Sequence, residues 1–407
     1  MRAGNIEGLF PSLTHRDFRL LWIWGFVSNI GTWVQNVALG LYIHEVYHAP
    51  GWLGLVNFFT YLPVILFFLP AGSLADSRDR RRILIATQMI MIASALALAV
   101  LVQLGIARLP GICLTAFLMG VGVAFNFPAW LAIVPELVPR EHLLNAISLN
   151  AASWNLARFL GPMLASAIIA VASFSACFFV NGASFFPFVI ALLAISLPAI
   201  TAARGAAVSR RTIAAGISYA YRRRLIRNLL ITLGTINLFA LPYIVFIPVF
   251  GKDILKRGNL VVSALYAAAG LGAVVGAPLV TRLNRTVDEI TLVRGGVAGI
   301  ALSLLAFSWS TTPWLSIPLA FTTGLSFLTA TTSINTTLQL KTEPEMRGRV
   351  MSFYVFMLAG AYPVGGALLG LIANWAGMSW AMTIGASLCL AWGAMIILRP
   401  ELLGDAR

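Results

Sequence analysis

The charged residues of this chain are few, and the most closely spaced of them fall in one short segment. Only 10% of the 407 residues are charged. Residues 72–82 read Gly72-Ser-Leu-Ala-Asp76-Ser-Arg-Asp-Arg80-Arg81-Arg. A carboxylate here can interact with the N-terminus of a neighbouring helix, and an arginine can reach a carboxylate on an adjacent helix. These residue types predict ion pairing at the ends of helices rather than bond-making chemistry.

A second set of residues consists of groups that could bind protons or anions. No acidic residue lies in the middle of an apolar segment, so Glu45, Glu136 and Asp253, at segment ends, are the candidates for proton coupling. Arg158 is the only charged residue deep inside an apolar segment. A charge at such a place usually faces a cavity or a pathway. We expect Arg158 to bind an anionic group or to assist a proton relay; the alternative is that it pairs locally and only fixes its helix.

The third set consists of amides and tyrosines within the apolar segments, where they must turn away from lipid. Together with Arg158 they predict a large, aromatic and nearly uncharged cavity that suits a bulky organic molecule. Hydrogen bonding between helices is the alternative role of each residue. The predicted cavity residues are Asn29, Gln35, Asn36, Asn57, Tyr61, Asn126, Asn155, Arg158, Asn237, Tyr243, Asn335, Tyr354 and Tyr362.

Sequence motifs of enzymes do not support catalysis. The chain has no Gly-x-Ser-x-Gly motif and no phosphate-binding or dinucleotide-binding loop. Cys113, Cys177 and Cys389 all lie in apolar segments and are expected to be small buried side chains. We therefore expect no enzymatic activity, no metal site and no cofactor.

The elements that position these residues must be membrane helices. Hydrophobic residues make up 59% of the chain, and a helix needs about 20 apolar residues to cross a bilayer. The apolar runs are continuous, which favours helices over a barrel. Twelve spans are predicted, at 19–44, 52–75, 83–106, 110–134, 146–172, 174–198, 228–251, 260–283, 290–310, 313–338, 350–374 and 378–398.

The arginines and lysines predict the orientation of these spans. Of the 28 basic residues, 23 fall in the two terminal segments and in every second loop, and four fall in the intervening loops. The positive-inside rule places the basic side, including both termini, in the cytoplasm. The net charge of +14 then faces anionic lipid rather than nucleic acid. We expect a monomeric, multi-pass protein of a prokaryotic inner membrane that contacts lipids and a small organic molecule.

The two halves of the chain resemble each other. Gly161-Pro162 and Tyr362-Pro363 are 201 residues apart, as are Asn36 and Asn237. This predicts two six-helix bundles, residues 1–198 and 228–407, joined by a cytoplasmic linker at 199–227 that contains a short amphipathic helix. Proline can kink a helix, so Pro162 and Pro363 are candidate bending points next to Arg158 and Gly161; a small-residue packing seam is the alternative.

Residues 72–82 resemble the loop between the second and third spans of the major facilitator superfamily. Gly72, Leu74, Ala75, Asp76, Arg80 and Arg81 match that signature, whereas Ser77 and Asp79 depart from it. The run of three arginines after Asp79 is similar to the drug-efflux branch that includes enterobactin-exporter-like and macrolide-efflux proteins. The segments 125–141 and 146–162 also resemble this branch, and the likeness covers most of the chain.

The resemblance implies a twelve-helix secondary transporter that exports a bulky drug or siderophore-like solute by rocking alternating access, with proton antiport as one means of coupling. It implies a conformational latch of Gly72, Asp76, Arg80, Arg81 and Glu136, in which Asp76 contacts the eleventh span near Val350 and Arg80 pairs with Glu136. It also implies that Gly161-Pro162 is an antiporter-type kink. The alternatives are a lipid or lysolipid flippase and a non-transporting receptor or partner subunit on the same fold.

Overall fold

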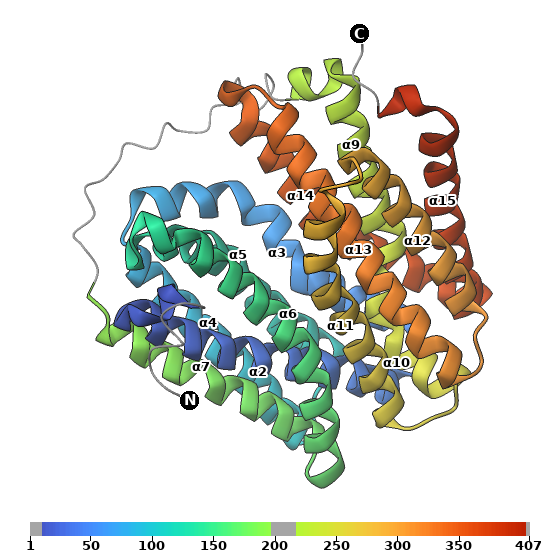
Figure 1. Ribbon diagram of the computed structural model, residues 1–407. Coiled ribbons are helices and arrows are strands. Elements are labelled where there is room, and N and C mark those ends of the chain that lie inside the picture. The colour runs from blue at the N-terminus through green and yellow to red at the C-terminus, as the bar shows by residue number, and fades with distance from the viewer. Residues whose placement is uncertain (1–9, 197–216, 404–407) are drawn as a thin grey trace. The chain divides into compact units, whose positions relative to one another are not determined.

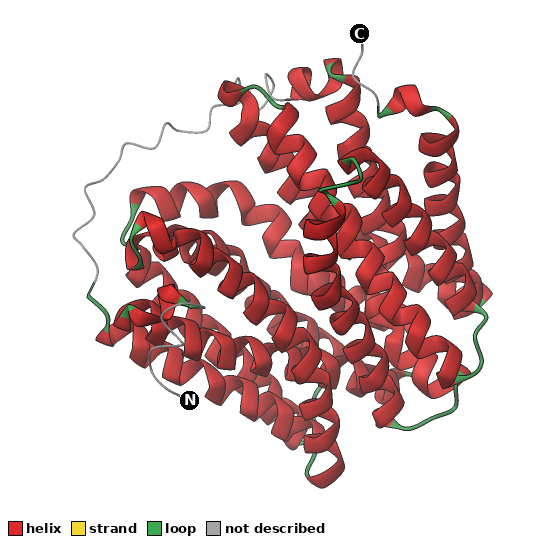
Figure 2. Cartoon of the chain, viewed as in Figure 1, coloured by secondary structure: helices red, strands yellow, loops and turns green. Residues whose placement is uncertain are grey.

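The computed structural model describes residues 10–196 and 217–403, and within these residues the chain contains helices and loops but no strands (Figure 2). Twelve long helical segments are present, and eleven are long and apolar enough to cross a membrane. The remaining one, α2, is long enough, but Asn29, Gln35 and Asn36 in its middle lower its mean hydropathy. The protein is therefore an all-helical, multi-pass membrane protein, as the sequence predicts. The predicted linker at 199–227 lies largely outside the described residues; its part from 217 onward is helical up to residue 222.

The helices divide into two compact units. The first unit contains residues 1–39 and 62–207, and the second contains residues 40–61 and 208–407. The helices of the first half are α2 (Arg16–Tyr47), α3 (Pro50–Ser77), α4 (Arg80–Gln103), α5 (Leu109–Leu137), α6 (Arg140–Val171) and α7 (Phe174–Ala194), labelled in Figure 1. Those of the second half are α9 (Arg224–Thr235), α10 (Ile247–Val249), α11 (Asn259–Leu283), α12 (Glu289–Ser308), α13 (Pro313–Lys341), α14 (Pro344–Ala376) and α15 (Met378–Leu398).

Equivalent helices in the two halves make equivalent contacts. In the first unit α4 packs against α5 and α7, and in the second unit α12 packs against α13 and α15. These helices are the third, fourth and sixth long segments of their respective halves. The contact-based units group residues 40–61 with the second half and meet between residues 207 and 208. The predicted division into bundles at 1–198 and 228–407 with a linker at 199–227 stays a prediction.

Polar side chains cap several helices where they leave the apolar region. The Asp79 carboxylate accepts a hydrogen bond from the Arg81 amide at 2.9 Å and so begins α4, which explains an acidic residue where the resembling family has glycine. Asp288 caps α12 in the same way through Thr291. Hydrogen bonds from Thr291 hold the pKa of the Asp288 carboxyl below its usual value.

The seventh span is continuous but irregular. After α9 the chain forms a π-helix (η3, Ile236–Ala240), a 3-10 helix (η4, Leu241–Phe246), the single turn α10 and a second π-helix (η5, Phe250–Ile254). Pro242 and Pro248 lie in this stretch and cannot donate main-chain hydrogen bonds. Short π and 3-10 segments inside helices often mark functional sites. The sequence predicts this span but not its irregular geometry.

Residues 40–61 are grouped with the second unit because α3 crosses α14 at a seam of glycines. A Cβ added to Gly54 would lie 2.4 Å from the carbonyl oxygen of Gly366, and one added to Gly370 would lie 3.2 Å from the Cα of Gly51. The Gly51 amide donates a hydrogen bond of 2.9 Å to Asn374 Oδ1. The two backbones therefore touch along this glycine seam, which any side chain at these positions would separate.

Candidate functional site

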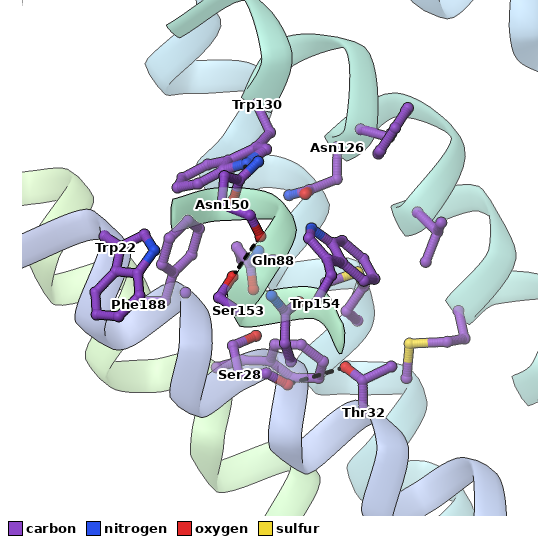
Figure 3. Close-up of a pocket in the computed structure, with 17 residues that line it drawn as sticks. Trp22, Ser28, Thr32, Gln88, Asn126, Trp130, Asn150, Ser153, Trp154 and Phe188 are labelled. Carbon is purple, nitrogen blue, oxygen red and sulfur yellow. Dashed lines mark hydrogen bonds between the residues drawn. The ribbon is translucent and has the colours of Figure 1, made fainter. Parts of the chain in front are cut away.

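The first unit contains a cavity between five of its helices (Figure 3). The empty space between its side chains is about 690 Å³, part of it open to solvent. Six aromatic rings form much of the wall, and four amides and three hydroxyl groups form the rest of its polar surface; none of the lining residues is charged. The lining residues are Trp22, Gly25, Ser28, Asn29 and Thr32 of α2, Gln88 and Met91 of α4, Met119, Val123, Asn126, Phe127 and Trp130 of α5, Asn150, Ser153 and Trp154 of α6, and Phe185 and Phe188 of α7.

Several polar groups of the cavity wall are hydrogen-bonded to the protein itself. The Trp130 indole donates to Asn150 Oδ1 at 3.1 Å, and the Asn126 amide donates to Thr87 Oγ1 at 3.1 Å. The Ser153 hydroxyl donates to the Asn150 carbonyl at 2.8 Å, drawn as a dashed line in Figure 3. These bonds fix the side chains, so the wall is pre-organised for a ligand.

Two of the predicted cavity residues, Asn29 and Asn126, line this cavity. In the same unit Gln35 is buried and accepts a hydrogen bond from Asn181 at 2.8 Å, while Asn155 donates to the Ala151 carbonyl at 2.9 Å. The Arg158 guanidinium lies 5.7 Å from the ring centre of Trp33, a cation–π contact outside the lining residues. Asn36 is exposed.

The other predicted cavity residues lie in the second unit. The rings of Tyr61 and Tyr362 meet edge to face with centroids 5.3 Å apart. Asn237 donates to the Leu233 carbonyl at 2.9 Å, and Tyr354 donates to the Thr331 carbonyl at 3.4 Å. Three further residues complete the set: Asn57 lies against Gly366, the Tyr243 ring against Phe307, and the Asn335 oxygen accepts from Gln339. Their roles in binding stay predictions.

Sequence reasoning missed most of the cavity wall. Trp22, Gln88, Trp130, Asn150 and Trp154 all line it, yet none is in the predicted set. Their residue types are the expected ones, an amide or an indole within an apolar span. Knowing which face of each helix they occupy would have been needed to select them, and the sequence alone does not supply that.

The residues of the 72–82 segment form the predicted ion pair at the end of α5. The Arg80 guanidinium binds the Glu136 carboxylate and also donates to the Ala132 carbonyl at 3.1 Å. The Arg81 guanidinium donates to the Leu193 carbonyl of α7 at 2.5 Å. A Cβ added to Gly72 would meet no atom of the described residues within 4 Å. The Asp76 side chain lies outside the described residues, so its contact near Val350 stays a prediction.

Replacing Arg80 with alanine should destabilise the first unit by about 1 kcal/mol, because Arg80 joins α4 to the end of α5 and is largely buried. Arg82→Ala is the matched control, since the Arg82 side chain is 88% exposed and meets only Asp79. Thermal unfolding of this unit can be followed with a thiol-reactive dye in protein whose Cys389 has been replaced, because Cys113 and Cys177 are buried until the unit opens. Equal unfolding temperatures for the two variants would contradict this role of Arg80.

Two adjacent ion pairs join the end of α2 to η5 within the second unit. His44 Nε2 lies 3.0 Å from Asp253 Oδ1, and Lys252 Nζ lies 3.0 Å from Glu45 Oε1. The His44 side chain is only 7% exposed, while that of Asp253 is 56% exposed. Two of the three predicted proton-coupling residues, Glu45 and Asp253, thus meet in one cluster, and the third, Glu136, is held by Arg80. A role for His44 was not predicted from the sequence. A signal was present, because the first span of each half ends in a basic–acidic pair, His44-Glu45 and Lys252-Asp253.

Residues 44–48 also have the spacing His-Glu-x-x-His, which in zinc hydrolases places two histidine ligands and a general base on one helix face. Here α2 ends at Tyr47, His48 has a φ of 52°, and His44 and Glu45 are bound to Asp253 and Lys252. No group of three or more histidine, cysteine, aspartate or glutamate side chains in the described part of the chain is placed to hold a metal ion. His48 therefore lies beyond the helix on which that arrangement depends.

The predicted kink residues lie inside long helices. Pro162 is within α6 and Pro363 is within α14, and both prolines are buried. A Cβ added to Gly161 would lie 2.3 Å from the Cβ of Trp33, so α6 and α2 touch at this glycine. Bending at these prolines during a transport cycle stays a prediction.

The profile of the transmembrane secretion effector family matches residues 7–404 of the chain. The staphyloferrin A transporter of Staphylococcus aureus (strain NCTC 8325 / PS 47) is 23% identical over 86% of this chain and 87% of its own. Macrolide efflux protein A of Streptococcus pyogenes is 23% identical over 92% of this chain and 94% of its own length. The enterobactin exporter EntS of Escherichia coli O1:K1 / APEC is 24% identical over 88% of this chain and 85% of its own length.

A solved structure has the same fold. It is a bacterial homologue of the human lysosomal transporter Spinster in an inward-facing and occupied conformation, which superposes with a TM-score of 0.76 at 13% identity and covers 95% of this chain and 96% of that one. Family and fold are those of membrane transporters, as the resemblance implies. This chain belongs to the transmembrane secretion effector family, within the efflux transporters of the major facilitator superfamily.

Proposed function

We propose that this protein exports an organic solute across the cytoplasmic membrane by alternating access, with the cavity of the first unit as a binding site. The observation that carries the proposal is the cavity wall of aromatic rings and amides without a charged residue. Such a wall suits an organic molecule and not a small ion, which would need several charged or carbonyl ligands. The efflux functions named for the related proteins support the outward direction.

Alternating access requires a contact that opens and closes, and the glycine seam is the candidate. In this structure residues 40–61 rest on the helices of the second half through Gly51, Gly54, Gly366 and Gly370. The arginine distribution predicts that this end faces outward, with both termini in the cytoplasm. Release of a solute to the outside would then require the seam to part.

The contact between His44 and Asp253 would couple the seam to protons. A hydrogen bond between two charged partners is stronger than a neutral one, so the charge of this pair would decide how firmly residues 40–61 are held to η5. The other titratable groups nearby are Glu45, Lys252 and, across from Gly40, the Tyr266 hydroxyl of α11. A proton bound from outside at this pair would stabilise the closed seam. This order fits antiport, in which proton capture follows release of the solute.

Transport in liposomes with an imposed pH gradient tests the proposal. Macrolides, catecholate siderophores and lysolipids would be supplied one at a time, and a pH-sensitive dye inside would record the gradient. We expect at least one solute to dissipate the gradient with the natural chain, and His44→Asn to abolish that dissipation while labelled solute still moves downhill. Glu45→Gln breaks only the neighbouring pair with Lys252, so gradient dissipation should persist.

Three results would change the proposal. Dissipation lost in Glu45→Gln and kept in His44→Asn would move proton coupling to Glu45. Movement of lysolipid without proton movement would favour a flippase. Absence of movement for every solute would contradict export of these classes.

A further inference from the structure

The cavity of the first unit contains two buried polar atoms that no described residue satisfies. Gln88 Oε1 accepts no hydrogen bond, and Trp22 Nε1 donates none. Both residues line the cavity, and Gln88 as a whole is only 3% exposed. Figure 3 labels both side chains, Gln88 from α4 and Trp22 from α2. Two residues of the cavity wall therefore each carry an unsatisfied polar atom, one an acceptor and one a donor.

An unused buried acceptor is unfavourable, because it loses its bond to water and gains nothing in return. The cost is typically about 1–3 kcal/mol for each such group. The neighbouring polar groups do not share this state, since Trp130, Asn126 and Ser153 all donate to protein atoms. A ligand that donates to Gln88 and accepts from Trp22 would remove the cost at both places.

The rest of the wall restricts the charge and shape of that ligand. A charged group placed here would meet no opposite charge, and burying an unpaired charge is much more costly than burying a neutral polar group. The six rings can pack against a flat apolar or aromatic face, and the unbranched side chains of Met91 and Met119 can adjust to its edges.

We infer that this cavity binds an uncharged ligand with a flat, apolar or aromatic body, a hydrogen-bond donor directed to Gln88 and an acceptor directed to Trp22. Aromatic amines, phenols and lactams that also carry a carbonyl acceptor have this chemistry. The inference rests on the proposed function only in taking the cavity to be a solute site. It sets the cavity apart from Arg158, which lies over Trp33 and does not line the cavity.

Three coumarins that differ in one group each provide the test. The compound 7-amino-4-methylcoumarin is neutral and has both a donor and a carbonyl acceptor. Its 7-dimethylamino analogue lacks the donor, and its 3-acetic acid derivative carries a negative charge. Binding to the purified full-length protein in nanodiscs can be measured by energy transfer from tryptophan, because Trp22, Trp130 and Trp154 line the cavity.

We expect the aminocoumarin to bind about tenfold more tightly than either analogue. In Gln88→Leu the preference for the amino over the dimethylamino compound should disappear, because the acceptor is gone. This variant removes an unsatisfied atom from the interior, so it should fold at least as well as the natural chain. Gln339→Leu, an amide of α13 in the other unit, is the matched control and should keep the preference.

Two results would overturn the inference. One is equal or tighter binding of the acetic acid derivative, and the other is an unchanged preference in Gln88→Leu. Transport is measured separately, in the liposomes described above. Coumarin binding without any solute movement would leave the inference standing and contradict the proposed export. Solute export that neither Gln88→Leu nor added coumarin changes would support the proposed export and contradict the inference.

Discussion

Replacing Gly54 with leucine is expected to reduce transport by more than tenfold while the protein still inserts and folds. The new Cβ would lie 2.4 Å from the Gly366 carbonyl oxygen and 3.0 Å from the carbonyl carbon. These are main-chain atoms of a long helix, which cannot move aside as a flexible side chain can. Residues 40–61 must therefore move away from α14, and the seam can no longer close. The helices themselves keep their hydrogen bonds, so insertion should be preserved.

The measurement pairs transport with the exposure of a buried position in the seam. Ala373 of α14 is 5% exposed, and a cysteine placed there should react slowly with a membrane-impermeant thiol reagent. Adding Gly54→Leu should increase that rate at least tenfold. Gly295→Leu is the matched control, because a Cβ at Gly295 meets no described atom within 4 Å. Normal transport together with slow labelling in Gly54→Leu would show that the seam does not need to close.

Replacing Gly365 with alanine should be the most destabilising single-methyl change in the second unit. Its Cβ would lie 1.9 Å from the carbonyl oxygen of Leu238 and 2.7 Å from the carbonyl carbon, both in the π-helix η3. An inserted methyl group in a packed interior typically costs about 1–3 kcal/mol. The upper end of that range applies here, because the obstacle is backbone that is already held in an unusual geometry.

Gly348 offers the comparison on the same helix. A Cβ at Gly348 meets no described atom within 4 Å, so Gly348→Ala should be neutral or stabilising by up to about 1 kcal/mol through helix propensity. Both variants can be made with Cys389 as the sole cysteine, since this residue is fully buried in α15 and reports on the second unit. Similar thermal unfolding curves for Gly365→Ala and Gly348→Ala would refute the close contact with η3.

The sequence predicts the helices well because the length of an apolar run is a local signal. The pairing of Arg80 with Glu136 is implied instead by the resemblance of residues 72–82 to a known family. The cavity does not follow in this way. The helices are apolar around most of their circumference, so the face that meets lipid and the face that packs look alike in the sequence. Gln88 is therefore hard to tell from any other amide in a span.

Two other features depend on contacts far apart in the chain. His44 lies at the end of its helix in the sequence, and only the approach of η5 buries it against Asp253. The glycine seam likewise needs the register of α3 on α14, which no pattern in either helix specifies. The irregular geometry from 236 to 254 has a local signal in Pro242 and Pro248, but proline in a membrane helix has several outcomes, and packing against Gly365 decides among them.

The boundary between the two units cuts through helices and not through loops. It falls between Leu39 and Gly40 within α2 and between Tyr61 and Leu62 within α3. Gly40 is a weak helix former, and Pro63, one residue beyond the second boundary, leaves a main-chain carbonyl without its helical partner. Any motion of one unit against the other must therefore flex two continuous helices near these residues. Such helices store elastic energy as they bend, so a motion of this kind would be opposed by a restoring force toward the starting shape.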